Sequence, residues 1–195
     1  QKTAYEIPKR DWSSDVCSSD LKNKFTLLTS VMLSAQCTDV NVNKVTKNIY
    51  RNYYKPKHFV DLGINKRKNL IKKIGLFNTK AKNLYYLSKI LIKKYNGKVP
   101  NKFEELILLP GVGRKTANVV LNVAFNKPTI AVDTHVFRVS IRTGLSDGKN
   151  PEQVENQLLR ILPKKNIKKA HHLILLHGRY ICKARNPLDR KSTRL

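Results

Sequence analysis

The chain has 195 residues, of which 39 are Lys or Arg and 13 are Asp or Glu, giving a formal net charge of +26. With 41% apolar residues, a chain of this length can bury the core of one or two domains, which excludes wholesale disorder. The charge favours a polyanionic partner, although A/T-rich codons also raise the number of lysines. No apolar run approaches the ~20 residues of a membrane span, and the three cysteines are too dispersed for a disulfide framework. We therefore expect a soluble, cytoplasmic protein with no membrane partner.

Apolar residues recur at helical spacing along nearly the whole chain, and strand signals are almost absent. The first two helices are expected from about 25 to 36 and from 42 to 53. A third stripe runs from about 81 to 95, where Asn96-Gly97 should end the helix. Together these patterns predict an all-α protein.

The second half of the chain carries clearer helix boundaries. Asn101 and Glu104 predict a capping box for the short helix that follows. Asn150, followed by Pro151, predicts another helix start, and the last helix is expected at about 167 to 180. Residues 128 to 132 are a strand candidate without a partner strand, so we interpret them as an extended linker and place a domain boundary next to it, between residues 127 and 128.

Two stretches differ in composition from the rest of the chain. Residues 10–21 are rich in Ser and Asp and lack Lys, and residues 189–195 are also out of character. Both read like translated adapter DNA. We interpret them as non-native residues and exclude them from the prediction of the fold.

The residues Pro110-Gly111-Val112-Gly113 lie between two apolar runs and are followed by Arg114-Lys115-Thr116. Two glycines at this spacing allow a tight turn whose amides point outward, and the positive end of the next helix favours an anion. The pattern predicts a helix-hairpin-helix at about 103–125 that holds a DNA phosphate. The alternative is a plain corner between two helices.

Lys115 and Asp133 are the candidates for chemistry. Lys115 lies in the first turn of the expected second hairpin helix, where the helix dipole and neighbouring cations favour a neutral, nucleophilic amine. Asp133 opens the next helix, where a carboxylate can take a proton or stabilise a cation. Without catalysis, Lys115 would be a cation that contacts a phosphate and Asp133 would be an ordinary helix cap.

With these residues in these positions, the chain resembles the endonuclease III family of helix-hairpin-helix DNA glycosylases and AP lyases. The resemblance covers about residues 22 to 188. It rests on five ordered stretches: Leu33 to Lys44, Ile74 to Ala81, Leu109 to Asn122, Pro128 to Arg138, and Leu176 to Tyr180.

The resemblance implies a role for each matching residue. Lys115 corresponds to the family's Schiff-base lysine and Asp133 to its catalytic aspartate, which implies removal of damaged pyrimidines followed by strand cleavage 3′ to the abasic site. Gln36 and Leu76 correspond to side chains that fill the space of the extruded base; without the resemblance they would be a polar helix end and a core leucine. The implied DNA contacts are Gln36, Leu76, Gly111, Val112, Gly113, Arg114, Thr116 and His135.

Two other functions stay open at this level. A helix-hairpin-helix module can bind DNA without catalysis, and a monofunctional glycosylase removes the base without cutting the strand. The resemblance implies duplex DNA with damaged bases or abasic sites as the partner of a monomeric, nucleoid-associated and bacterial protein.

The resemblance also implies a two-lobed fold and a cofactor. One lobe is a helical-barrel domain, 22–127, and the other combines 1–21 with 128–195; the active site lies between the two lobes. The second lobe of the family carries a [4Fe–4S] cluster on four cysteines. Cys182 matches the first ligand, but the next two positions are Leu188 and Lys191. We expect that the cluster does not assemble in this chain, because one thiolate cannot hold it.

Overall fold

The computed structural model describes residues 23–37 and 39–188, and the described residues contain helices and no strands. The chain divides into two compact units between Val99 and Pro100. This confirms the all-α fold class predicted from the sequence. The lobe boundary expected between residues 127 and 128 concerns the family's domain arrangement and stays a prediction.

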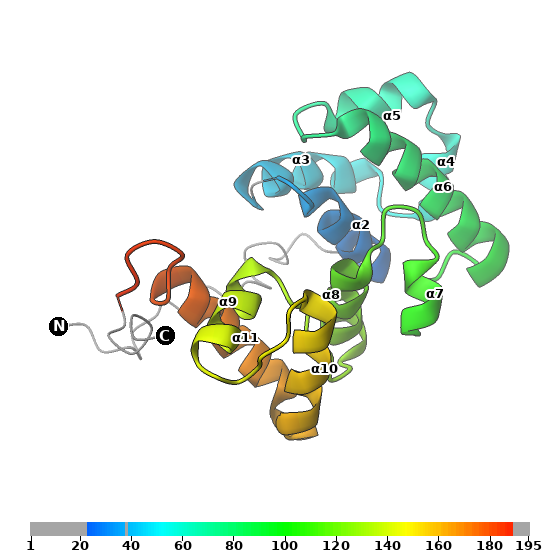
Figure 1. The fold of residues 1–195 in the computed structure, drawn as a ribbon. Helices are drawn as coiled ribbons and strands as arrows, with labels where there is room; N and C mark the ends of the chain where they lie inside the picture. Colours follow the sequence, from blue (N-terminus) through cyan, green and yellow to red (C-terminus); the bar gives the residue numbers. More distant parts are fainter. Residues whose placement is uncertain (1–22, 38, 189–195) are drawn as a thin grey trace. The chain divides into compact units, whose positions relative to one another are not determined.

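The first unit contains a long helix that contacts three others. Helix α6 packs against α2, α4 and α5, while α3 packs against α2 and α5 (Figure 1). Apolar side chains from all five helices fill the core of this unit. The bounds are α2 Lys24–Ser34, α3 Asp39–Asn52, α4 Pro56–Asp61, α5 Ile64–Ile71 and α6 Phe77–Tyr95.

Helix ends in the first unit follow recognisable chemistry. The Asn23 side chain accepts a hydrogen bond from Thr26 N, and the Thr26 hydroxyl accepts one from Asn23 N, so α2 begins with a reciprocal capping box. Helix α6 ends at Asn96, which adopts a left-handed backbone, as predicted from Asn96-Gly97. Helices α4 and α5 were not predicted, because α4 has only six residues and α5 has eight, of which half are Lys or Asn.

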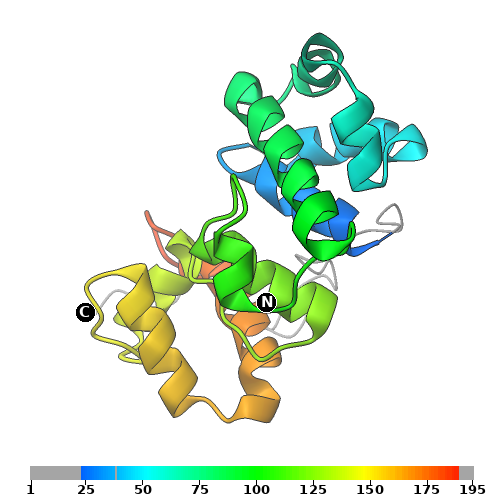
Figure 2. The ribbon, with the colours of Figure 1, turned by 90° about the vertical axis from the view of Figure 1, so that its right-hand side faces the viewer.

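The second unit contains one pair of packed helices and one group of three. Helix α7 packs on α8, and α9 packs on both α10 and α11 (Figures 1 and 2). A short 3₁₀ turn, η1 Lys164–Asn166, leads into α11. The bounds of the helices are α7 Phe103–Ile107, α8 Arg114–Phe125, α9 Thr134–Arg142, α10 Pro151–Ile161 and α11 Ile167–Tyr180.

Two predicted helix starts in this unit have different outcomes. Asn150 caps α10 by accepting a hydrogen bond from Gln153 N at 2.9 Å, with Pro151 in the first helical position, as predicted. The capping box predicted from Asn101 and Glu104 is wrong. Helix α7 begins one residue later, with Lys102 at the N-cap and no side-chain cap.

Residues 128–132 lie in no helix or strand, as expected for a linker, and Ile130 to Val132 are buried. Within the described ranges, no helix combines the length and the apolar character that a membrane crossing needs. The two stretches interpreted as non-native, 10–21 and 189–195, lie outside the described residues.

Candidate active site

The predicted hairpin turn connects α7 to α8. Val112 N donates to Leu109 O at 3.0 Å, and Gly111 has a φ of 79°, which with Pro110 before it is the arrangement of a type II turn. Leu109 and Val112 are buried, so the turn is anchored at both ends. Gly111 is exposed, and its positive φ explains why glycine stands there.

The start of α8 presents backbone donors. Gly113 is the N-cap residue and supplies no side chain, and the helical ladder begins with Ala117 N bonding Gly113 O at 2.9 Å. The first amides of a helix have no partner within that helix, and its positive dipole end lies at the same place. A phosphate oxygen placed at this turn would satisfy those amides.

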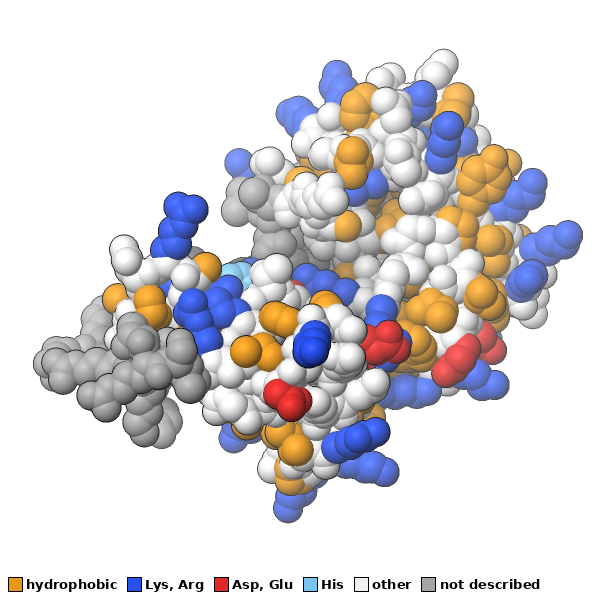
Figure 3. All heavy atoms as spheres, in the orientation of Figure 1, with side chains coloured by type: hydrophobic (Ala, Val, Ile, Leu, Met, Phe, Trp, Pro, Cys, Tyr) orange, Lys and Arg blue, Asp and Glu red, His pale blue; other side chains and the backbone are white. Residues whose placement is uncertain are grey.

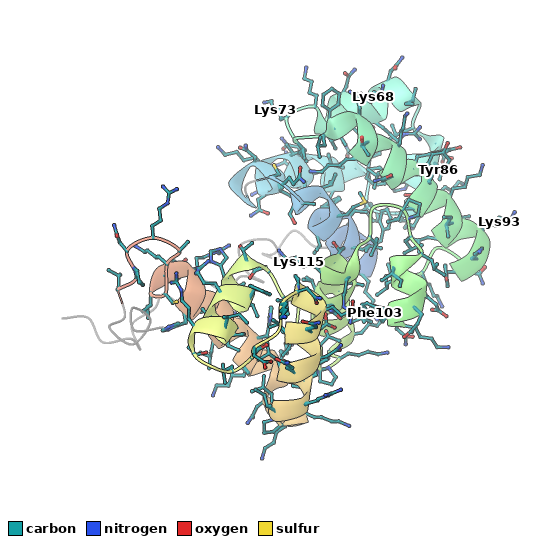
Figure 4. The ribbon with its side chains drawn as sticks, viewed as in Figure 1. Lys68, Lys73, Tyr86, Lys93, Phe103 and Lys115 are labelled. Atoms are coloured by element: carbon teal, nitrogen blue, oxygen red, sulfur yellow. The ribbon has the colours of Figure 1, made fainter. Side chains whose placement is uncertain are left out.

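Lys115 follows in the first turn of α8 and is exposed (Figure 4). The buried Ala117 comes two residues later, and Thr116 between them is half-buried. The lysine is therefore presented outward from a helix whose opposite face is held in the core.

Arg114 is engaged with protein partners. Its Nε and Nη2 donate to the two carboxylate oxygens of Glu155 at 2.9 and 3.3 Å, and Nη1 lies 3.0 Å from Glu152. The guanidinium also lies over the Phe103 ring, 5.1 Å from its centroid. The hydrogen bond that Arg114 donates to the Glu155 carboxylate raises the pKa of Arg114 above its ordinary value. These contacts join the start of α8 to α10 and α7.

Asp133 caps helix α9. Its Oδ1 accepts from His135 N at 2.9 Å and from Val136 N at 2.8 Å, which confirms the predicted helix cap. Both bonds end on Oδ1, so the cap fixes the carboxylate while Oδ2 takes no part in it. A carboxylate at this position lies at the positive end of the helix dipole.

The start of α9 packs closely against α11. A Cβ on Gly178 would lie 2.9 Å from the His135 Cβ, so only glycine fits between these helices. Arg138 Nη2 donates to Gly178 O at 2.7 Å and lies 3.2 Å from His135 Nδ1. His135 is thus held by α11, beside the cap of Asp133.

His171 is a residue of this region that the sequence did not indicate as part of the site. It lies on α11, and burial lowers its pKa to about 4; Asp133 acts in the opposite direction, while His172 and Lys115 lower the pKa further. The charges of Asp133 and Lys115 therefore both reach one buried imidazole. The second unit brings the two predicted catalytic residues into the same electrostatic neighbourhood.

The two predicted base-replacing residues lie in the first unit, and both have an unusual backbone. Cys37 N bonds Ser34 O at 3.1 Å across a tight turn in which Gln36 has a φ of 54°. Leu76 has a φ of 57° and is 60% exposed. Among the described non-glycine residues with positive φ, the remaining three are all Asn, which tolerates this conformation far better than Gln or Leu.

These two turns touch each other. A Cβ built on Gly75 lies 3.4 Å from the backbone oxygen of Gln36. Gln36 is exposed like Leu76. Backbone strain in exposed residues is a signal of function rather than of packing. The structure therefore brings Gln36 and Leu76 together on one surface of the first unit.

The residues present do not fit an iron–sulfur cluster. The Cys182 thiol is buried and lies 3.6 Å from Arg142 Nη1, which donates to it. In the described part of the chain, no group of three or more His, Cys, Asp or Glu side chains could hold a metal ion. Leu188, at the position of the second family ligand, is 70% exposed.

The fold and the hairpin turn are those of helix-hairpin-helix DNA glycosylases. A trapped covalent intermediate of endonuclease III with DNA superimposes with a TM-score of 0.82 at 46% identity, covering 88% of this chain and 85% of that one. A non-covalent endonuclease III–DNA complex gives a TM-score of 0.83 at 45% identity, covering 89% of this chain and 87% of that one.

The chain belongs to the HhH-GPD superfamily of base excision DNA repair proteins, which residues 29–164 match. It is 59% identical to endonuclease III of Rickettsia felis over 94% of this chain and 86% of that protein. It is 51% identical to endonuclease III of Escherichia coli K12 over 86% of this chain and 80% of that protein.

Proposed function

We propose that the protein is a bifunctional base-excision repair enzyme. It removes oxidised or otherwise damaged pyrimidines from duplex DNA and then cleaves the strand 3′ to the abasic site. The observation that carries this function is Lys115, presented in the first turn of α8 directly behind a phosphate-binding turn, in a chain so similar to endonuclease III. In a helix-hairpin-helix that only bound DNA, this lysine would contact a phosphate and would form no covalent bond.

In the proposed reaction the Lys115 amine is the nucleophile. Its Nζ bonds to C1′ of the deoxyribose, while the glycosidic bond breaks and its electron pair leaves with the damaged base. Only the uncharged amine has a free electron pair, so a proton must leave Nζ before attack. Asp133 is the proposed acceptor of that proton and the anion that stabilises the cationic sugar.

The second step follows from the covalent bond. A proton then moves from Nζ to the ring oxygen O4′, which leaves C1′ with the electron pair of their bond, and the nitrogen lone pair forms an iminium at C1′ that acidifies the protons on C2′. Removal of one C2′ proton expels the 3′ phosphate with its bonding electrons, and this β-elimination cuts the strand. Water then releases the lysine.

The DNA contacts divide by role. The amides of Gly113 to Thr116 at the start of α8 bind a backbone phosphate, while the Val112 amide closes the turn on Leu109 O; the phosphate contact positions the duplex without reading its sequence. Gln36 and Leu76 enter the base stack that the target nucleotide leaves, at the cost of a few kcal/mol for unstacking, which is least for a damaged or mispaired base. Arg114 contributes chiefly by holding α8 against α10, and His135 lies beside the Asp133 cap.

Borohydride trapping tests this function. An imine between Lys115 and an abasic duplex is reduced to a stable covalent complex that gel electrophoresis resolves. We expect trapping by the wild type and by Lys102→Gln, an exposed lysine of the same unit, and none by Lys115→Gln. A folded wild type that traps nothing would establish the non-catalytic DNA-binding module instead.

The same reactions distinguish the monofunctional alternative. If damaged bases are released but nicks appear only after alkali or heat, the protein is a glycosylase without lyase activity. We also infer that the natural setting is the cytoplasm beside nucleoid DNA, and that the chain acts as a monomer, which sedimentation would test.

The family's [4Fe–4S] cluster is proposed not to assemble on this chain. Cys182 is the one residue that matches the cysteine pattern, and its thiol accepts a hydrogen bond from Arg142. A broad visible absorption band and stoichiometric iron in the purified chain would contradict this.

A further inference from the structure

Helix α6 carries a lysine that is almost fully buried. Lys80 is 6% exposed, and its Nζ donates to Leu33 O at 2.9 Å and to Ala35 O at 2.6 Å. Lysines are almost never buried to this degree unless their charge is matched. Burial lowers the pKa of Lys80, while the Cys37 thiol acts in the opposite direction.

The ammonium group caps the C-terminal end of helix α2. Leu33 lies in the last turn of this helix and Ala35 is its C-cap residue, so Nζ satisfies carbonyls that have no partner within the helix. A cation at this place also complements the negative end of the helix dipole. Gln36 is the next residue along the chain, so the ammonium fixes the backbone on which Gln36 stands.

The main chain of the same lysine holds the other turn. Lys80 N donates to Leu76 O at 3.0 Å. The Gly75 backbone also lies near the Gln36 carbonyl, since a Cβ added to Gly75 would be 3.4 Å from that oxygen, so the two turns are neighbours. One residue therefore binds the Gln36 turn through its side chain and the Leu76 turn through its backbone.

Both turns hold a strained residue that needs such support. A left-handed backbone costs roughly 1 kcal/mol or more for residues other than Gly and Asn, and it persists only where surrounding contacts impose it. For Gln36, the contacts that impose it include the two hydrogen bonds from Lys80 to the carbonyls just before it.

We propose that Lys80 is a positioning residue that locks the Gln36 and Leu76 turns into one rigid wedge for base extrusion. This rests on the proposed function. The ammonium acts through Gln36 and Leu76, because it is buried beneath their turns. Its loss is expected to slow extrusion of a paired base and to leave the chemistry of Lys115, in the other compact unit, intact.

The two activities of the enzyme separate these effects. Excision of a damaged pyrimidine from a duplex requires extrusion of a stacked, paired base, whereas a preformed abasic site has no base to extrude. The ratio of the single-turnover rate on a duplex with 5,6-dihydrouracil to that on the same duplex with an abasic site therefore reports the wedge.

The variant Lys80→Met removes the positive charge and the hydrogen-bond donors but keeps a side chain of similar size. We expect it to lower the rate ratio about tenfold, which corresponds to loss of part of the extrusion energy. Lys82→Met removes an exposed lysine of the same helix and should leave the ratio unchanged. Lys80→Arg keeps a buried cation with several donors and should restore most of the ratio. A 2-aminopurine opposite the lesion should show slower unstacking only in Lys80→Met.

The measured rates distinguish a positioning role of Lys80 from a merely structural one. A ratio unchanged in Lys80→Met, or a fall of both rates by the same factor, would overturn the inference and leave Lys80 as a merely structural contact. Should Lys80→Met fail to unfold cooperatively, the ratio measured on Lys80→Gln, which keeps an amide donor, takes its place. A wild type inactive on both substrates would instead refute the proposed function.

Discussion

His171 makes the stability of the protein depend on pH. Burial lowers its pKa from 6.5 to about 4, so between these values the unfolded chain binds more protons than the folded one. The free energy of unfolding should therefore be highest above pH 6.5 and should fall by about 3 kcal/mol as the pH drops through this window.

Urea denaturation at a series of pH values measures this dependence. The variant His171→Gln cannot take up the proton, so its unfolding free energy should be flatter between pH 4 and 6.5. His172→Gln, a substitution of the neighbouring half-buried histidine, should retain most of the wild-type slope. Equal slopes for the wild type and His171→Gln would assign the pH dependence to other groups.

The ion pair between Arg114 and Glu155 is expected to stabilise the fold. The Glu155 side chain is 8% exposed and accepts both guanidinium bonds, whereas Glu152 is 62% exposed. Removing the partner of a buried charge is costly, while a surface ion pair contributes little. We expect Arg114→Ala to lower the free energy of unfolding by about 2 kcal/mol, given that the arginine is partly exposed.

The matched change is Glu152→Gln, which should cost less than about 1 kcal/mol. Chemical denaturation of the two variants and the wild type gives both numbers. If the two substitutions cost the same, the buried carboxylate of Glu155 is compensated by water rather than by Arg114.

At the level of secondary structure, Asp133 at the start of α9 is an observed helix cap and the proposed proton acceptor. Asn is as good an N-cap as Asp, so Asp133→Asn should leave stability within about 0.5 kcal/mol of the wild type, whereas Asp133→Ala should lose about 1 kcal/mol. Both variants remove the carboxylate charge and should lose most borohydride trapping on abasic DNA.

The control lies at the start of the neighbouring helix. Asn150 caps α10 in the same way, and Asn150→Ala should cost about 1 kcal/mol while trapping is unaffected. Full trapping by Asp133→Asn would mean that Asp133 is only a helix cap.

Whether a helix could be predicted from the sequence depended on its length and on the residues at its ends. The helix at 167–180 was predicted at its observed bounds, because its apolar stripe is long and regular. Helices α4 and α5 are too short and polar for periodicity to show. The predicted cap of α7 failed by one residue, which is the usual error where a helix begins without a side-chain hydrogen bond.

Part of the candidate site could also be predicted from the sequence. The glycine pattern, Lys115 and Asp133 are local in sequence, so their placement at helix starts followed from the sequence alone. The left-handed backbone of Gln36 could not be predicted, because Ala35-Gln36 lacks the Gly or Asn that marks such turns. The burial of Lys80 depends on contacts 45 and 47 residues away, which no local pattern encodes.

At the scale of the whole molecule, the described part of the first unit carries the higher net charge, +15 against +9 for residues 100–188, because the second unit has more acidic residues. Residues 23–99 contain seventeen Lys and Arg and only two acidic residues. The visible face of α5 and α6 shows Lys and Arg side chains, while the visible acidic side chains lie near α7 and α10 (Figure 3). Lys68, Lys73 and Lys93 project outward from the first unit (Figure 4). This charge adds a sequence-independent attraction to DNA.

Binding to undamaged duplex DNA should therefore weaken steeply with salt. If about five phosphates are neutralised, the logarithm of the binding constant falls with the logarithm of salt concentration at a slope near −4.5, a loss of about 10²–10³ between 50 and 200 mM. Fluorescence anisotropy of a labelled duplex measures the slope. An uncharged osmolyte at the same osmolality should change the affinity little, because it releases no counterions. A slope near zero would mean that the lysines are solvated surface residues and that the hairpin turn alone holds the DNA.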